Sequence, residues 1–237
     1  MHPLQAIDAS VKLILEKHFT EPRVFKTLDE SPTFLPRNNE EKQPKEVMVL
    51  VLGETAHSMN FSLNGYEKLT NEFTKKLDVI SFEDITSFGT ATAESVPCMF
   101  STHTRDNFDK ADAVHQQNVL DIAKLTSADV LWVNNNSGCK SVCDRAETIV
   151  IEKNKSHELC DGSYYYDEVL LAPMRKKLAN LEQDTTVIAL HMVGSHGPTY
   201  YRRYPKEFLK FTPECAQSDI QNCTIESLVN TYDNTLL

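Results

Sequence analysis

A threonine-rich turn holds the residue of this sequence with the clearest chemical potential. In the stretch SFGTATAESVPCMFS, Ser87 to Ser101, small hydroxylic residues precede an apolar segment that is expected to be helical. Thr92 would then lie near the start of a helix, where backbone N–H groups and the helix dipole favour an anion. A threonine hydroxyl is a weak nucleophile until something lowers its pKa. Taken alone, Thr92 is better interpreted as a helix N-cap.

Glu54 offers the activation that Thr92 lacks. It follows the run EVMVLVLG, and a carboxylate at the end of a strand buried on both faces is costly unless it is paired or binds a metal. A metal ion held by Glu54 could act as a Lewis acid on the threonine hydroxyl. The two residues together therefore predict a metal-activated nucleophile.

Two further segments carry polar groups that suit a phosphate. Asn136, Ser137 and Lys140 follow the run DVLWV, and their amide, hydroxyl and ammonium groups can bind phosphate oxygens. The alternative is a common Asn/Ser/Gly turn with a solvated lysine. His196, within GSHGP, could bind metal or substrate, although a single loop histidine more often does neither. His191, just inside the preceding strand, is expected to be structural.

Alternating strands and helices are expected to position these residues. Apolar runs predict strands within residues 46–54, 78–86, 128–136 and 185–193, and helical patterns occupy Tyr66–Leu77, Asp112–Leu125 and Asp167–Leu181. This order predicts an α/β fold with a mostly parallel central sheet flanked by helices. Sites in such sheets lie beyond the carboxyl ends of the strands, so the polar segments after all four strands are expected to converge. They predict metal-assisted phosphoryl or sulfuryl transfer without fixing the substrate.

The N-terminal part of the chain differs from the rest. Residues 1–18 have the pattern of an amphipathic helix, and residues 19–45 are polar, contain four prolines and show no period. We therefore expect a helix and linker over residues 1–45 and a catalytic domain over residues 46–237.

Composition excludes two classes of protein. The 237 residues are 41% hydrophobic, and the formal net charge of −10 is spread along the chain, which argues against nucleic-acid binding. No run approaches the roughly 18 apolar residues that a membrane span needs. The N-terminus has no signal-peptide pattern, so the chain as written is expected to have neither a signal peptide nor a transmembrane helix.

The six cysteines are informative by their spacing. Cys139 and Cys143 are four residues apart, Cys215 and Cys223 bracket a polar loop, and Cys98 and Cys160 stand alone. Two local pairs suggest disulfide-closed loops in an oxidising compartment, but six free thiols are about equally compatible with the spacing. Zinc binding by these cysteines is disfavoured because no CxxC pair is present.

Several long segments resemble one known family. They are VLVLGETA, NFSLNGY, ITSFGTATAESVPCMFS, NVLDIAKL, DVLWVNNNSGCKSVCDR, YYDEVLL, HMVGSHGPTYYRRYPKEFLKFTPEC and LVNTYDNTLL. From about Glu46 to its end the chain resembles the phosphoethanolamine transferases of Gram-negative bacteria. These enzymes modify lipid A and lipopolysaccharide core, include the mobile colistin-resistance enzymes, and share the alkaline phosphatase/sulfatase fold.

The resemblance implies a role for each candidate residue. Thr92 would carry phosphoethanolamine as a phosphothreonine and, with Glu54, bind the catalytic zinc ion; Asn136, Ser137 and Lys140 would line the phosphoethanolamine pocket, and His196 would bind or protonate the substrate. The implied donor is phosphatidylethanolamine, and the acceptor is a lipid A phosphate or a core sugar. The implied location is the periplasmic face of the inner membrane. The pairs Cys139–Cys143 and Cys215–Cys223 match two disulfides of the family.

Departures from the family pattern limit what the resemblance implies. The family's zinc site needs an Asp-His pair from an SDHGES-type motif, and no Asp-His dipeptide occurs here. Glu54 and Thr92 supply two oxygens, fewer than the three or four protein ligands that zinc usually takes, so the zinc site is expected to be incomplete. The family's transmembrane helices are also missing, and we interpret the chain as an internal fragment, truncated at its C-terminus and inactive by itself.

Single positions depart as well. His57 stands where the family usually has Arg, and Asn107 lies where some relatives carry a Glu in the substrate pocket. Phe88 stands where a cysteine often pairs with the position of Cys98, and another cysteine is usual as a partner for Cys160. These two cysteines are expected to be unpaired, unless they pair with each other.

Two rival functions remain at this point. One is a sulfatase or phosphatase of the same fold, which releases its group to water. The other is a non-catalytic remnant or binding protein of the same fold, which the missing Asp-His pair favours.

Overall fold

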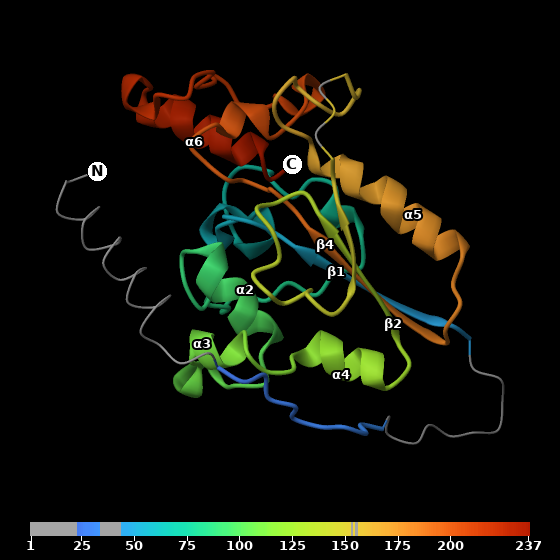
Figure 1. Cartoon of the computed structure of the whole chain (residues 1–237). Coiled ribbons are helices and arrows are strands. Elements are labelled where there is room, and N and C mark those ends of the chain that lie inside the picture. The colour runs from blue at the N-terminus through green and yellow to red at the C-terminus, as the bar shows by residue number, and fades with distance from the viewer. Residues whose placement is uncertain (1–22, 34–43, 153, 155) are drawn as a thin grey trace.

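Figure 1 shows the computed structural model of the chain, in which residues 23–33, 44–152, 154 and 156–237 are described. The amphipathic helix predicted at residues 1–18 lies outside the described residues. Within the predicted linker, Lys26 lies beside residues 115–117, where its backbone N–H donates to His115 O and its carbonyl accepts from Gln117 N.

A parallel sheet organises the chain. Its strands are β1 (Glu46–Leu52), β2 (Asp129–Asn134), β3 (Glu147–Val150) and β4 (Thr185–His191), in the order β1-β4-β2-β3. Every strand pair is parallel, which confirms the predicted α/β class. The register aligns His191 with Leu52 on one side and with Asn134 on the other, so β1, β4 and β2 end at one level. The loops that follow these three strands consequently meet.

Helices cover both faces of the sheet. They are α2 (Thr92–Phe100), α3 (Lys110–Ala113), α4 (Val119–Leu125), α5 (Leu171–Ala179) and α6 (Ile225–Asn234). In Figure 1, α2 and α4 lie on one side of the sheet and α5 on the other, while α6 lies beyond the end of the sheet. Sheet and helices therefore form the flanked arrangement that the sequence predicts.

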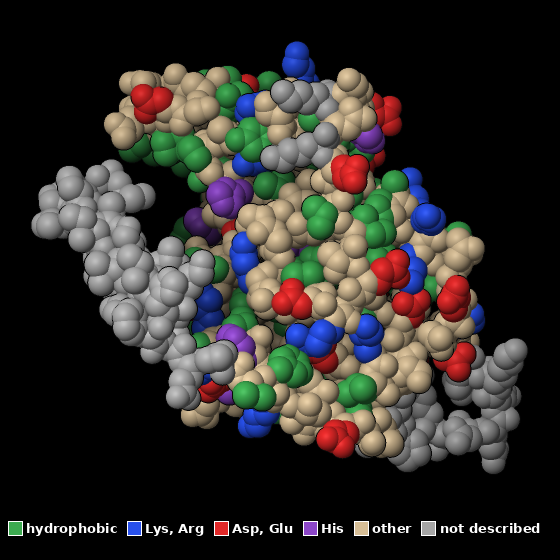
Figure 2. Space-filling view, viewed as in Figure 1, with side chains coloured by type: hydrophobic (Ala, Val, Ile, Leu, Met, Phe, Trp, Pro, Cys, Tyr) green, Lys and Arg blue, Asp and Glu red, His purple; other side chains and the backbone are tan. Residues whose placement is uncertain are grey.

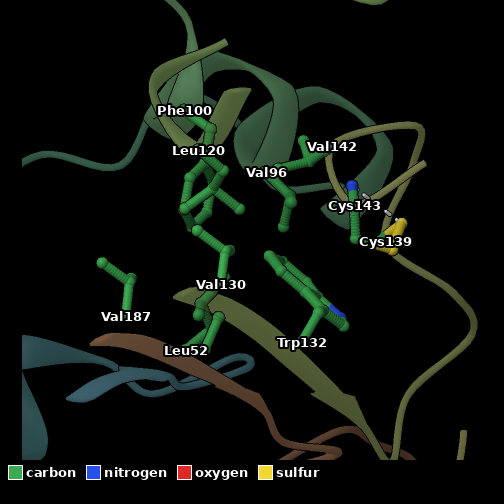
Figure 3. Close-up of a cluster of buried hydrophobic side chains, with 11 residues drawn as sticks. Leu52, Val96, Phe100, Leu120, Val130, Trp132, Cys139, Val142, Cys143 and Val187 are labelled. Atoms are coloured by element: carbon green, nitrogen blue, oxygen red, sulfur yellow. Dashed lines mark hydrogen bonds between the residues drawn. A yellow bond between two sulfur atoms is a disulfide. The ribbon is translucent and has the colours of Figure 1, made fainter. Parts of the chain in front are cut away.

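Alternate side chains of the central strands fill two hydrophobic clusters. Trp132 of β2 is fully buried and packs with Val96 and Phe100 of α2 and Leu120 of α4 on one face (Figure 3). On the other face, residues of β2 and β4 pack against Leu170 and its neighbours. Successive side chains of a strand point to opposite faces, which is why one apolar run can serve both clusters. Both helical layers are thus anchored to the strands whose ends carry the polar loops.

The prediction of a strand at residues 78–86 is wrong. The segment is irregular and its apolar side chains are exposed, with Ile80 at 85% and Phe82 at 68%. Among the described residues, no strand pairs with it, and a strand without a partner cannot satisfy its backbone groups by a ladder. The turn that carries Thr92 is therefore positioned by α2 and not by a preceding strand.

The helix predicted over Tyr66–Leu77 is also wrong, because polar side chains hold this segment in turns. Thr70 is fully buried, and its hydroxyl donates to Asn60 O and accepts from Ser62 N. Such side-chain bonds to the backbone compete with helix formation. Only the short 3-10 turn Thr74–Lys76 forms here.

The other helical predictions are confirmed in part. Asp112–Leu125 is divided into α3 and α4, because Asn118 and Asp121 form a capping box that starts α4 anew. Asp167–Leu181 begins with the 3-10 turn Asp167–Leu170 and continues as α5. β3 was not predicted, since four residues give too short a pattern.

β1 differs from the sequence expectation of a strand buried on both faces. It is an edge strand among the described residues, and pairs there with β4. Several of its apolar side chains are exposed, with Met48 at 57% and Val51 at 60%, while Leu52 is buried in the core at 8%.

Candidate active site

Thr92 and Glu54 lie in direct contact. Thr92 Oγ1 donates a hydrogen bond of 2.6 Å to Glu54 Oε2, although the residues are 38 positions apart. Thr92 is the first residue of α2, and the N-cap is Ala91, which makes no side-chain cap. The alternative interpretation of Thr92 as an N-cap is therefore wrong. Its hydroxyl is aimed at the carboxylate that follows β1.

Asn136 ties the ends of three strands together. Its Nδ2 group donates to Met192 O at 2.7 Å and lies 3.4 Å from Glu54 Oε2. Asn136 follows β2, Met192 follows β4 and Glu54 follows β1. The level ends of the parallel strands thus bring two of the predicted residues together, Glu54 and Asn136, and Thr92 joins them from the start of α2.

Ser137 and Lys140 lie together in the next turn. Lys140 Nζ donates to Ser137 O at 2.7 Å and lies 3.0 Å from Ser137 Oγ. Lys140 has a φ of 54° and Gly138 has a φ of 92°, so the chain reverses tightly. A disulfide between Cys139 and Cys143 closes this turn. The ammonium group is consequently held beside the Asn136 loop.

His196 lies on the loop after β4 and is exposed. Its Nδ1 is 2.9 Å from Gly197 O, and its carbonyl accepts from Arg203 Nε at 2.9 Å. Asn136, Ser137, His196 and Arg203 all line one cavity of about 480 Å³. Burial lowers the pKa of the Arg203 guanidinium, which stays a cation at neutral pH. The cavity therefore combines apolar walls with these polar groups and the Arg203 cation.

Asn107 is not joined to this group. Its Nδ2 donates to Thr104 Oγ1 within its own turn, and its carbonyl lies 3.0 Å from His103 Nδ1. Among the described residues, no hydrogen bond connects it to Thr92, Glu54 or Asn136. A substrate-binding role for Asn107 stays a prediction.

His191 is structural, as the sequence predicts. It is 2% exposed, and its Nδ1 lies 2.9 Å from Asn134 Oδ1. Burial lowers the pKa of His191 to about 4, so the ring is neutral at physiological pH. Through its contact with Asn134, the His191 side chain links the ends of β4 and β2.

Asp167 holds the loop after β4 and was missed by sequence reasoning. Its carboxylate accepts from Val193 N at 2.9 Å, Gly194 N at 2.8 Å and Asn135 Nδ2 at 2.7 Å. Burial raises the pKa of this carboxyl group, while these hydrogen bonds oppose the rise. No local sequence signal distinguishes it from an ordinary acidic residue at a helix start.

Two oxygens are available for a metal at the centre of the site. The Glu54 carboxylate is a ligand that zinc accepts, and the Thr92 oxygen converges with it, so the pair fits as part of a zinc site. Among the described residues, the cluster of metal-ligating side chains is Cys139, Cys143 and Asp144. Its two sulfurs form a disulfide and cannot act as thiolates, so this cluster does not supply the zinc site.

Both predicted disulfides are present, Cys139–Cys143 and Cys215–Cys223. Cys98 and Cys160 are free, so the alternative in which they pair with each other is wrong. Burial raises the pKa of the Cys98 thiol, which keeps it protonated at neutral pH.

The largest cavity lies beside the site and not in it. It has a volume of about 1310 Å³, and its walls are mostly apolar, including Met59, Phe61, Ile80, Phe82, Ile85 and Met99. None of the predicted polar site residues lines it. On the face shown in Figure 2, acidic and basic side chains are interspersed.

Comparisons with known proteins agree with this geometry. The sulfatase family matches residues 46–237. Phosphoethanolamine transferase EptA of Escherichia coli K12 is 48% identical over 193 residues, which are 81% of this chain and 35% of that protein. Phosphatidylethanolamine transferase Mcr-1 of Escherichia coli is 39% identical over 198 residues, which are 81% of this chain and 37% of that protein. The chain thus spans about a third of the length of these relatives.

Solved structures give the same picture. The soluble domain of lipooligosaccharide phosphoethanolamine transferase A from Neisseria meningitidis has a TM-score of 0.81 and 38% identity, over 90% of this chain and 64% of that domain. The periplasmic domain of EcEptC from Escherichia coli, solved in complex with zinc, has a TM-score of 0.64 and 21% identity, over 85% of this chain and 58% of that one. The second likeness shows the fold alone. None of the helices in the described part of the chain is long and apolar enough to cross a bilayer.

Proposed function

The chain belongs to the sulfatase family, with phosphoethanolamine transferases among its relatives, and from this premise we propose that it contributes the nucleophile-bearing part of a zinc-dependent phosphoethanolamine transferase. The donor is phosphatidylethanolamine, and the acceptor is lipid A or the lipopolysaccharide core. The enzyme acts at the periplasmic face of the inner membrane. Polymyxin resistance would be the expected consequence where lipid A is the acceptor.

The contact between Thr92 Oγ1 and Glu54 Oε2 carries the proposal. The hydroxyl donates its proton towards the carboxylate, which leaves an oxygen lone pair free to attack phosphorus. The new Oγ1–P bond forms as the bond from phosphorus to the diacylglycerol oxygen breaks. Thr92 then carries phosphoethanolamine until an acceptor oxygen attacks the same phosphorus and releases the hydroxyl.

The surrounding residues bind and orient the transferred group. Lys140 would neutralise phosphate oxygens and Asn136 would hold them beside the Glu54 carboxylate. Ser137 and His196 line the neighbouring cavity and would complete the pocket. A zinc ion held in part by Glu54 and Thr92 would lower the pKa of the threonine hydroxyl when bound. Zinc usually takes three or four protein ligands, so further ligands would have to complete this site.

The test is to capture the covalent intermediate. We expect the protein, purified at its natural length and incubated with phosphatidylethanolamine, to gain the mass of one phosphoethanolamine group on the peptide that contains Thr92. Transfer to lipid A would follow. Turnover with water as the sole acceptor would instead identify a phosphatase-type or sulfatase-type hydrolase.

A second candidate function is a non-catalytic protein of the same fold. The observation that favours it is the two-oxygen donor set at Glu54 and Thr92, which is short of the usual zinc ligand number. Titration with zinc separates the candidates for these 237 residues. Weak or absent uptake is expected from the incomplete site, and tight stoichiometric uptake at Glu54 would contradict this interpretation.

A further inference from the structure

The last turn of α6 contacts the loops on both sides of Glu54. Tyr232 OH accepts from His57 N at 2.7 Å and donates to Thr55 O at 2.8 Å, which fastens the loop after β1. Thr235 Oγ1 lies 2.6 Å from Ser195 Oγ in the loop after β4. Tyr232 and Thr235, at the end of α6, therefore bind the two loops that lie on either side of the Glu54 carboxylate.

The loop after β1 needs such support. Thr55 has a φ of 56°, in the left-handed region that a β-branched residue rarely adopts. A residue in this conformation persists only where its surroundings hold it. The carbonyl of Thr55 is held by the Tyr232 hydroxyl, and the ring of His57 packs 5.4 Å from the ring of Tyr232.

The two loops are also joined through Glu54 itself. Ser195 N donates to Glu54 O at 3.0 Å, next to the point where Gly194 meets the Glu54 backbone. A shift of either loop would therefore move the Glu54 backbone and, with it, the carboxylate that accepts from Thr92.

We propose that Tyr232 is a positioning residue, which fixes the Glu54 backbone through Thr55 and His57 and so sets the carboxylate against the Thr92 hydroxyl. Its catalytic consequence rests on the proposed function, but the positioning itself does not. α6 acts from beyond the end of the sheet and contributes no group to the reacting atoms.

Tyr204 offers a matched control for Tyr232. The two rings are almost equally buried, with Tyr204 7% and Tyr232 8% exposed. Tyr204 OH donates to Glu214 Oε1 at 2.7 Å and lies 3.4 Å from Asn234 Nδ2, and neither partner belongs to the loops around Glu54. Replacing either tyrosine by phenylalanine removes one buried hydroxyl and keeps the ring.

Amide hydrogen exchange on the 237-residue chain tests the proposal. The informative amide is that of Ser195, which donates to Glu54 O and does not contact the Tyr232 hydroxyl. We expect Tyr232→Phe to speed exchange at Ser195 by about tenfold relative to the amides of β2 and β4, because the loop after β1 opens locally. Tyr204→Phe is expected to leave this ratio within about twofold of the parent chain.

Two outcomes would overturn the proposal. One is an unchanged ratio in Tyr232→Phe, and the other is an equal rise in both variants, which would mark a general loss of stability. In the natural-length protein, Tyr232→Phe should lower kcat and leave KM nearly unchanged. Absence of transfer in the parent protein would reject the proposed function and leave the exchange result standing by itself.

Discussion

Gly194 meets the backbone of Glu54 so closely that no larger residue fits. A Cβ atom at Gly194 would lie 2.8 Å from both the nitrogen and the carbonyl oxygen of Glu54, and the φ of Gly194 is 50°. Substitution by alanine must therefore move Glu54 as well as strain the turn. We expect Gly194→Ala to cost more than about 2 kcal/mol of unfolding free energy and to remove transfer activity.

Substitution of Gly138 separates backbone strain from the steric clash with Glu54 as causes of the destabilisation. Gly138 also has a left-handed φ of 92°, but nothing lies within 4 Å of its missing Cβ. Gly138→Ala should cost only about 1 kcal/mol, from backbone strain. Urea unfolding of the two variants measures the difference, and equal costs would show that the close approach to Glu54 is unimportant.

Thr92 should be essential for covalent transfer. We expect Thr92→Ala to reduce activity by at least about a thousandfold, because no oxygen remains to attack phosphorus. Thr92→Ser retains the hydroxyl and should keep measurable activity. Thr90→Ala changes a threonine of the same turn and should be nearly neutral. Mass spectrometry of the donor-treated protein gives the readout, and an adduct persisting in Thr92→Ala would exclude this nucleophile.

Lys68 and Asp233 form the most buried ion pair that joins α6 to the rest of the chain. Their charged atoms are 2.8 Å apart, and the Asp233 side chain is fully buried, where it also accepts from Asn60 and Tyr66. Asp233→Ala leaves these donors without this acceptor and Lys68 without its charged partner, although Lys68 Nζ still donates to Asn230 Oδ1 at 2.7 Å. We expect a loss of about 3 kcal/mol of unfolding free energy.

An exposed ion pair is the control for this prediction. Arg23 and Asp112 pair at the surface, with side chains 49% and 55% exposed. Asp112→Ala should cost less than about 1 kcal/mol in the same unfolding measurement. Similar costs for the two aspartates would mean that burial does not decide the strength of the Asp233 pair.

His191 should make stability depend on pH. Burial lowers its pKa from 6.5 to about 4, so between these values the unfolded chain binds the proton and the folded chain does not. The contribution is complete above the unfolded pKa and is lost as the pH falls towards the folded one, by a total on the order of 3 kcal/mol. Urea unfolding across this range should show the loss, and His191→Gln should remove that part of the slope.

The predictable parts of this molecule are those that depend on local pattern. β2 and β4 follow from continuous apolar runs, and the meeting of Asn136 with Glu54 follows from the rule that parallel strands present their carboxyl ends together. For these features, residue chemistry and sheet topology were sufficient for a correct prediction. The fold class alone determines which strand ends lie next to one another.

The unpredicted parts depend on partners that are distant in sequence. Residues 78–86 have the apolar character of a strand, but a strand forms only where another strand pairs with it. Tyr232 acts on Thr55, 177 residues away, and nothing in the local sequence of either residue marks the other as its partner. Asp167 is similarly ordinary until the loop after β4 folds over it.

The exposed edge of β1 has a consequence for handling the polypeptide. Among the described residues, no strand pairs with its outer row of backbone groups from Val47 to Val51, and this segment has exposed apolar side chains without a proline, lysine or bulge to blunt the edge. Neighbouring copies can add their own strands to this row. At high protein concentration, intermolecular strand pairing at this edge should therefore lead to aggregation. The chemistry of Thr92 is best studied at low protein concentration.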